Sequence, residues 1–217
     1  MNYYYFGLVS SFSVILAVVL CALRLHIVQR RYFPFFLFLV MALSNEIASE
    51  ITGRVLRTNA PNSDIYALID SLIILWMFYE WRLFRRKGLY LFLGALLIAV
   101  WVADTLIWGS LMVFSSRFTI LYSLLTVLMS VQYINHLIIT EQRLTLRNPD
   151  FLICICLVVF YTAATIVEIF WFFGFDNSPT LAWNIYMIVP VVNIIVNLTY
   201  ALAVLWIPRK PAFITLS

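Results

Sequence analysis

The chain has few charged residues, few cysteines and few residues that interrupt a helix. Only 11% of its 217 residues are charged, whereas about a quarter of a soluble domain is charged. So small a polar fraction cannot cover a water-soluble globule, and three cysteines are too few for a disulfide scaffold. The composition therefore excludes a soluble domain, a disordered chain and a small disulfide-rich fold.

Hydrophobic residues make up the rest of the sequence. They account for 64% of the chain, and the mean hydropathy is +0.98. A membrane span needs about 20 apolar residues, so this length allows about seven spans and little else. We predict an all-α integral membrane protein whose residues 1–217 form a single seven-helix transmembrane domain. The expected spans are Phe6–Val28, Phe33–Leu56, Asp64–Phe84, Leu89–Gly109, Arg117–Thr140, Phe151–Gly174 and Thr180–Ile207.

The basic residues predict the orientation of these spans. Eleven of the 14 fall in alternate connections on one side: Arg24, Arg30, Arg31, Arg82, Arg85, Arg86, Lys87, Arg143, Arg147, Arg209 and Lys210. The other side has Arg54, Arg57 and Arg117. Because basic loops stay in the cytoplasm, we expect the N-terminus outside and the C-terminus inside. The net charge of +4 then reflects topology in a cell membrane, with the bacterial inner membrane expected, and no nucleic-acid partner.

The spans also suggest an internal repeat. Two segments recur at an offset of 118 residues: Glu50-Ile51 matches Glu168-Ile169, and Asn59-x-Pro61 matches Asn177-x-Pro179. This predicts a 3+1+3 arrangement of parallel units, residues 6–87 and 115–210, joined by a linker helix at 89–109. Chance matches between apolar spans are the alternative. The layout is similar to that of SWEET and PQ-loop transporters, and the topology to that of microbial rhodopsins. However, the chain has no Pro-Gln pair and no lysine in its last span, so neither family is assigned.

Five carboxylates fall in the outer half of the expected spans, where charge is costly and usually functional. Counting from the span ends puts four of them about 8–11 Å below the outer boundary. Glu46 lies one turn deeper than Glu50 on the same helix face. The remaining three are Asp70, Asp104 and Glu168. The hypothesis is one outward-facing acidic pocket; the alternative is that the carboxylates pair with the outer arginines.

The last span carries a polar stripe beside a proline. Asn193 and Asn197 are four residues apart, and Pro190 interrupts the helix one turn earlier. Such a helix can line a cavity, although the asparagines can instead hydrogen-bond neighbouring helices. The candidate ligand-binding residues are therefore Glu46, Glu50, Asp70, Asp104, Glu168, Asn184, Asn193 and Asn197.

No catalytic signature or cofactor motif is present in the sequence, and the metal content is left open. The first hypothesis is a carrier for a small cationic or hydroxylated solute, an ion or a coupled proton. The alternatives are a seven-helix sensor or accessory subunit, acting through a membrane partner or as a homo-oligomer, and a membrane enzyme with a carboxylate site. Carriers usually interrupt helices at their site. Here Pro190 is the one interior proline, so the first six spans are expected to be continuous.

Overall fold

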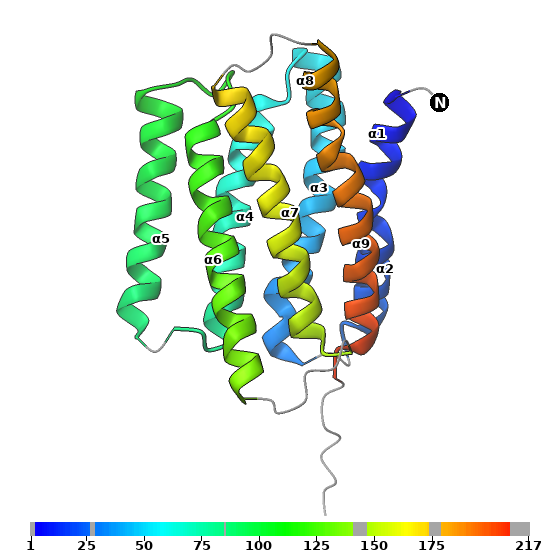
Figure 1. Cartoon of the computed structure of the whole chain (residues 1–217), viewed down its shortest axis with the longest axis vertical. Helices are drawn as coiled ribbons and strands as arrows, with labels where there is room; N and C mark the ends of the chain where they lie inside the picture. The colour runs from blue at the N-terminus through cyan, green and yellow to red at the C-terminus, as the bar shows by residue number, and fades with distance from the viewer. Residues whose placement is uncertain (1–2, 27–28, 85, 141–146, 174–178, 209–217) are drawn as a thin grey trace, which may run out of the picture.

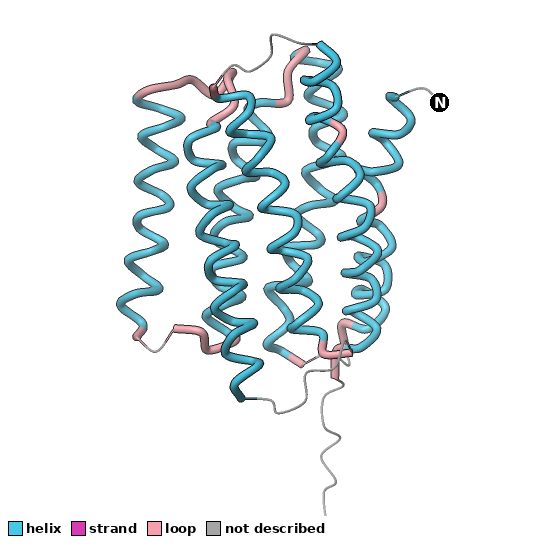
Figure 2. Tube along the Cα trace, in the orientation of Figure 1, coloured by secondary structure: helices cyan, strands magenta, loops and turns pink. Residues whose placement is uncertain are grey.

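A computed structural model describes residues 3–26, 29–84, 86–140, 147–173 and 179–208. Every regular element in these ranges is a helix, and the helices stand side by side as antiparallel rods (Figures 1 and 2). The elements are α1 (Tyr3–Phe12), α2 (Val14–Arg24), α3 (Phe33–Leu56), α4 (Ala60–Glu80), α5 (Lys87–Val102), α6 (Ser116–Thr140), α7 (Pro149–Phe172), α8 (Pro179–Tyr186) and α9 (Ile188–Trp206).

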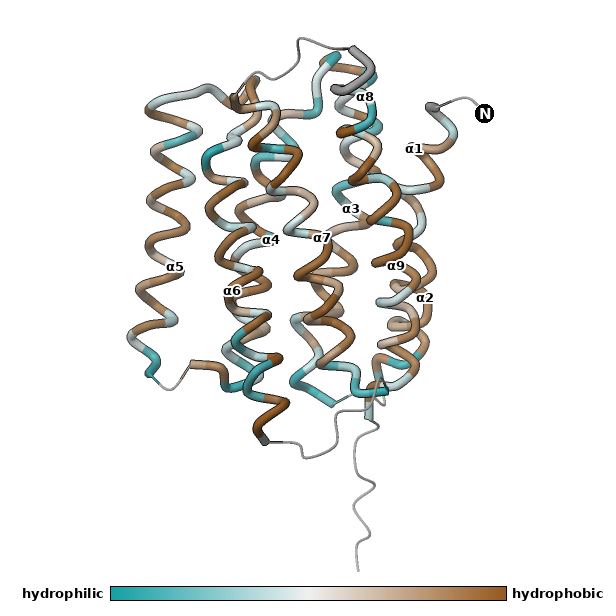
Figure 3. The backbone as a smooth tube through the Cα atoms, in the orientation of Figure 1, coloured by the Kyte–Doolittle hydropathy of each residue, from teal (hydrophilic) through white to brown (hydrophobic). Residues whose placement is uncertain are grey.

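Six rods in the described residues are long and apolar enough to cross a membrane: Tyr5–Arg24, Arg30–Leu56, Lys87–Ile107, Ser116–Thr140, Pro149–Phe172 and Trp183–Trp206. Figure 3 shows hydrophobic residues along the rods and hydrophilic stretches mainly toward their ends. The prediction of a protein built from apolar, membrane-length helices is confirmed. The predicted ends differ from the observed ones by a few residues, and Val28 and Gly174 lie outside the described residues.

Helix α4 is as long as the spans but less hydrophobic. It packs against α3, α5 and α6, and its residues Asp64 and Asp70 are both buried. Its polar side chains therefore face the interior of the bundle, where other helices supply hydrogen-bond partners. This explains why a helix with a low hydropathy lies inside an apolar bundle.

The first rod bends at Ser13, although Tyr5–Arg24 still forms one membrane-length helix and the Ser13 backbone stays helical. The amide nitrogen and the hydroxyl of Ser13 both donate to the carbonyl oxygen of Ser10, at 3.2 and 2.6 Å. A serine hydroxyl that bonds to the preceding turn competes with the helical ladder and bends the helix. The last rod is interrupted at Met187, near Pro190, as the proline predicts. The fourth predicted span also ends irregularly, in a π-helical segment at Ala103–Ile107.

Aromatic side chains pack together in the buried core beside the beginning of α3. Phe35 and Phe38 of α3 pack edge-on against Tyr200 of α9, with ring centroids 5.3 and 5.8 Å apart. All three side chains are buried. The three cysteines are free thiols buried in the same core, as expected for small apolar residues. The rings of Phe35, Phe38 and Tyr200 thus fix α9 against the beginning of α3.

The structure adds one observation on the predicted repeat. The repeat pairs the last rod with α4, but α4 is continuous where the last rod is divided into α8 and α9. Asn177, which belongs to one of the matching segments, lies outside the described residues. The repeat remains a prediction.

Candidate functional site

The carboxylates of the outer half do not share one pocket in the structure. They fall into three separate groups: Glu46 and Glu50 beside a cavity, Asp64, Asp104 and Glu168 at the start of α6, and Asp70 among tyrosines. Asp64 was predicted as the beginning of a span and not as a site residue. The grouping depends on how each helix is rotated about its axis. The depth of a residue along its span does not specify this rotation.

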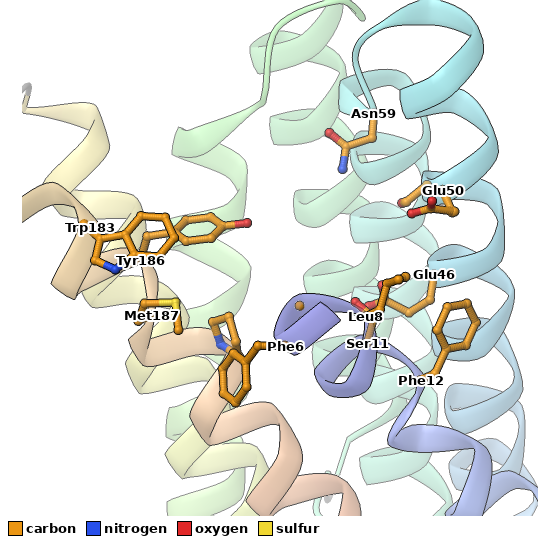
Figure 4. A pocket seen from close by; sticks show the side chains of 13 residues that line it. Phe6, Leu8, Ser11, Phe12, Glu46, Glu50, Asn59, Trp183, Tyr186 and Met187 are labelled. Atoms are coloured by element: carbon orange, nitrogen blue, oxygen red, sulfur yellow. The ribbon is translucent and has the colours of Figure 1, made fainter. Parts of the chain in front are cut away.

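The cavity lies between the first rod, the last rod and α3 (Figure 4). It has a volume of about 400 Å³ and is open to the surroundings. Its lining residues are Phe6, Gly7, Leu8, Ser11, Phe12, Glu46, Ser49, Glu50, Asn59, Trp183, Tyr186, Met187 and Pro190. The part of the last rod around Met187 and Pro190 thus forms one wall of the cavity. Helix α1 forms another wall. We call this cavity the outer pocket.

Glu46 and Glu50 supply the negative charge of the outer pocket. Glu50 pairs with Arg54 one turn further along α3, at 2.5 Å. This pair is weak because the Arg54 side chain is 71% exposed. Glu46 lies close to the Ser11 hydroxyl of α1, which also lines the pocket, and it is in none of the ion pairs found within the described ranges. Glu46 is therefore the carboxylate best placed to meet a cationic solute.

The second group binds the beginning of α6. Asp64 of α4 accepts hydrogen bonds from the Ser115 amide at 3.0 Å and the Ser115 hydroxyl at 3.1 Å. Asp104 accepts a hydrogen bond from the Phe118 amide at 2.9 Å, and Glu168 of α7 lies close to the Ser116 hydroxyl. The first amides of a helix lack partners within that helix, and its dipole is positive there. Asp64 and Asp104 therefore act as caps that fasten α6 to its neighbours.

An arginine completes this group. The Arg117 guanidinium lies 3.9 Å from Asp104 and stacks over the rings of Trp108 and Phe172, at 5.6 and 5.8 Å. The sequence analysis named pairing with an outer arginine as the alternative to the acidic pocket. That alternative describes Asp104 well.

The third group centres on Asp70, which is 1% exposed. The hydroxyl of Tyr161 on α7 donates to its Oδ2 atom. Its Oδ1 atom is buried and has no hydrogen-bond partner among the described residues. Asp70 does not line the outer pocket.

The asparagines of the last rod join helices together. The Asn193 amide donates to the Ser10 carbonyl at 3.2 Å, and the Asn197 amide donates to the Ser13 hydroxyl at 2.8 Å. Neither lines the outer pocket, and Asn184 lies exposed on α8, also outside the lining. Of the candidate ligand residues, Glu46 and Glu50 line the pocket.

Sequence reasoning missed a polar cluster at the opposite end of the bundle. Asp150, in the first turn of α7, is 2% exposed. It accepts hydrogen bonds from Arg31 at 2.8 Å, Tyr32 at 2.5 Å and Tyr133 at 3.0 Å. Asn148 is the N-cap of α7, and its side chain accepts the Asp150 and Phe151 amides, whereas the Asp150 carboxylate binds side chains. An acidic residue directly after a proline at a helix start is a recognisable signal, but it does not reveal these three partners, which are distant in sequence.

A second cavity of about 450 Å³ lies near this end, between α2, α3 and α4. Its lining residues are Cys21, Leu25, Gln29, Arg30, Tyr32, Phe33, Phe36, Trp76 and Glu80. The bundle therefore has a cavity toward each end, and the buried Phe35 and Phe38 lie in the same first turns of α3 as Phe33 and Phe36, which line this second cavity. We call this one the inner cavity.

In the part of the chain that the structure describes, no three His, Cys, Asp or Glu side chains come together in a group that could hold a metal ion. Comparison with known proteins gives no further guide to the chemistry. No protein-family model, no curated protein and no solved structure matches the chain.

Proposed function

We propose that the chain crosses a cell membrane seven times, with α4 as one of the spans. The N-terminus is then outside and the C-terminus in the cytoplasm. The antiparallel order of the rods supports this proposal, because it collects Arg24, Arg31, Arg82 and Arg147 at one end of the bundle. Basic residues of short loops favour the cytoplasmic side. The outer pocket then opens in the half of the membrane that faces outward.

We propose further that the protein is a carrier for a small cationic or hydroxylated solute that binds in the outer pocket. One observation carries the proposal: Glu46 and Glu50 line an open cavity between α3 and two rods, one that bends at Ser13 and one that contains Pro190. Pro190 has no amide hydrogen, so it leaves a carbonyl of the preceding turn without its helical partner, and carriers use such helix breaks at their binding sites. The aromatic rings of Trp183 and Tyr186 on the opposite wall suit a cation, which is attracted to an aromatic face.

The first and last rods are joined at both ends. The Ser10 hydroxyl donates to the Pro190 carbonyl at 2.8 Å, and Asn197 donates to Ser13. At the other end, Arg24 donates to the carbonyls of Val204 and Ile207. Since α9 also packs extensively against α7, the proposed rocking motion is one of these three rods together against α3, which would close the outer pocket.

The test is transport by the purified protein in liposomes that contain a pH-sensitive dye. Small inorganic and organic cations are added outside one at a time, with and without a pH gradient. Glu46→Gln keeps the size of the side chain but removes its charge, and we expect it to lower the flux about tenfold, which corresponds to roughly 1.4 kcal/mol of lost interaction. Glu50→Gln should have a smaller effect because Arg54 already compensates Glu50.

Glu168→Gln is the matched control, since Glu168 lies at a similar expected depth but near Ser116, outside the pocket lining. Its flux should stay within about twofold of the unmodified protein. A flux that Glu46→Gln and Glu50→Gln both leave unchanged would remove the proposed mechanism. If no cation moves and the protein co-purifies with a stoichiometric membrane protein, the accessory-subunit alternative is favoured instead.

A further inference from the structure

The net charge of the outer pocket is smaller than its two carboxylates suggest. The Arg54 guanidinium lies 2.5 Å from Glu50 and balances its charge, whereas Glu46 is in none of the ion pairs found within the described ranges. None of the described residues that line the pocket is a lysine or an arginine. One negative charge therefore remains on the wall that α3 forms, and it matches a solute with a single positive charge.

Aromatic side chains form much of the remaining lining. Phe6 and Phe12 come from α1, and Trp183 and Tyr186 come from α8. Trp183 and Tyr186 are three residues apart and share one face of α8, with ring centroids 6.2 Å apart and an angle of 35° between the rings. Figure 4 shows both rings on the side of the cavity opposite Glu46. A solute in the pocket thus has a carboxylate on one side and two aromatic rings on the other.

The volume and the lining of the pocket favour an organic ion over a metal ion. Small-molecule sites measure about 300–1,000 Å³, and this cavity of about 400 Å³ falls within that range. One water molecule takes about 30 Å³ of liquid, so a bare metal ion would leave most of the space to water. Hard metal ions also take about six to eight oxygen ligands, which apolar walls do not supply. An ion with alkyl groups would instead bury apolar surface against these walls.

We infer that the outer pocket recognises a quaternary ammonium ion, a nitrogen cation with four alkyl groups and no N–H donor. The inference rests on the proposed carrier function and names the substrate class of that site. Such a cation is attracted to aromatic faces, to that of tryptophan most strongly, and it needs no hydrogen-bond acceptor. A primary ammonium has three N–H donors, each of which needs an acceptor once it leaves water. The Trp183 indole has none to offer, since its nitrogen only donates.

The test is isothermal titration calorimetry of the purified protein in a detergent without an ammonium group. The probe is tetramethylammonium chloride, and methylammonium chloride and potassium chloride are titrated for comparison. We expect tetramethylammonium to bind at least about tenfold more tightly than either. Trp183→Leu should weaken this binding about tenfold, whereas Trp183→Phe keeps a ring and should weaken it only about two- to threefold.

Trp171→Leu is the matched control. Trp171 is an exposed tryptophan of α7 and does not line the pocket, so binding should stay within about twofold of that of the unmodified protein. Tyr186→Leu is the second test of the aromatic wall, and it replaces Trp183→Leu if that variant does not fold. Glu46→Gln should weaken binding of tetramethylammonium and of methylammonium alike, because both carry the same charge.

A second titration separates a free solute from a lipid headgroup, since phosphatidylcholine also carries a quaternary ammonium group. Here the probe is a short-chain phosphatidylcholine. Weaker binding than that of tetramethylammonium supports a free solute. Tighter binding that Trp183→Leu also weakens would assign the site to a lipid headgroup and would remove the carried solute.

Several outcomes would overturn the inference. Binding of methylammonium or potassium that equals or exceeds that of tetramethylammonium excludes the quaternary class. Unchanged binding in Trp183→Leu and Tyr186→Leu excludes the aromatic wall. Because calorimetry needs no transport, binding of tetramethylammonium without flux in liposomes contradicts the carrier alone. Flux of an inorganic cation without binding of tetramethylammonium contradicts this inference alone, and the absence of both binding and flux contradicts the two together.

Discussion

Replacing Asp150 by asparagine should destabilise the protein more than any change in the outer pocket. Asparagine keeps the shape of the side chain and one acceptor oxygen. It removes the negative charge of the carboxylate to which Arg31, Tyr32 and Tyr133 donate hydrogen bonds. Asp150 is 2% exposed and lies in the first turn of α7, where the helix dipole also favours a negative charge.

The magnitude follows from these contacts. A hydrogen bond to a charged group contributes about 1.5–3 kcal/mol, and the dipole adds about 0.3–1 kcal/mol. The Arg31 side chain is 41% exposed, so water can replace part of its lost partner. The asparagine oxygen can also keep one tyrosine bond. We therefore expect Asp150→Asn to lower the free energy of unfolding by about 3 kcal/mol.

The measurement is unfolding of the purified protein in mixed micelles with increasing denaturing detergent, followed by circular dichroism. Glu50→Gln is the comparison, because it breaks an exposed pair of neighbouring turns and should cost only about 0.3–0.5 kcal/mol. Tyr133→Phe alone should cost about 1 kcal/mol, and much less when Asp150→Asn is already present. The reasoning fails if Asp150→Asn costs no more than Glu50→Gln.

Three further predictions concern the other buried polar groups. Asp64→Asn and Asp104→Asn each weaken a cap of α6, so each should lower stability by about 1 kcal/mol in the same unfolding assay. Asn197→Ala removes bonds to Ser13 and Asn193 and should cost about 0.6–1.7 kcal/mol; a larger loss would mean that Asn197 does more than join helices. Native protein should resist a thiol-reactive maleimide until denaturing detergent is added, since the free thiols are all buried: Cys21, Cys154 and Cys156.

The positions of most helices follow from the sequence. Apolar runs bounded by charged or turn residues give the rods to within a few residues, because the cost of placing backbone and charge in lipid leaves few alternatives. Pro34 and Pro149 lie in the first turns of α3 and α7, where a residue without an amide hydrogen is tolerated. The break near Pro190 follows for the same reason. The bend at Ser13 does not follow from the sequence, because serine is common in helices and only the bond from Ser13 to Ser10 marks the position.

The depth of a residue along its helix also follows from counting, but the direction in which its side chain points does not. The sequence indicates that Glu46, Asp70, Asp104 and Glu168 lie in the outer half of the bundle. It cannot say which neighbour each of them meets, because that depends on how every helix is rotated about its axis. Rotation is set by packing between helices that are distant in sequence. One expected acidic layer is therefore three sites in the structure, with Glu46 at the pocket.

Composition and the order of apolar runs thus determine that this chain is a bundle of membrane-length helices, since those properties depend only on transfer from water to lipid. Tertiary structure alone decides what each rare polar group does. It gives Asp150 three partners from α6 and the beginning of the second rod, and it turns Asp64 and Asp104 into caps of α6. It also leaves one Asp70 oxygen without a hydrogen-bond partner among the described residues. Hydrogen bonds act over about 3 Å, so they exist only after packing has brought their partners together.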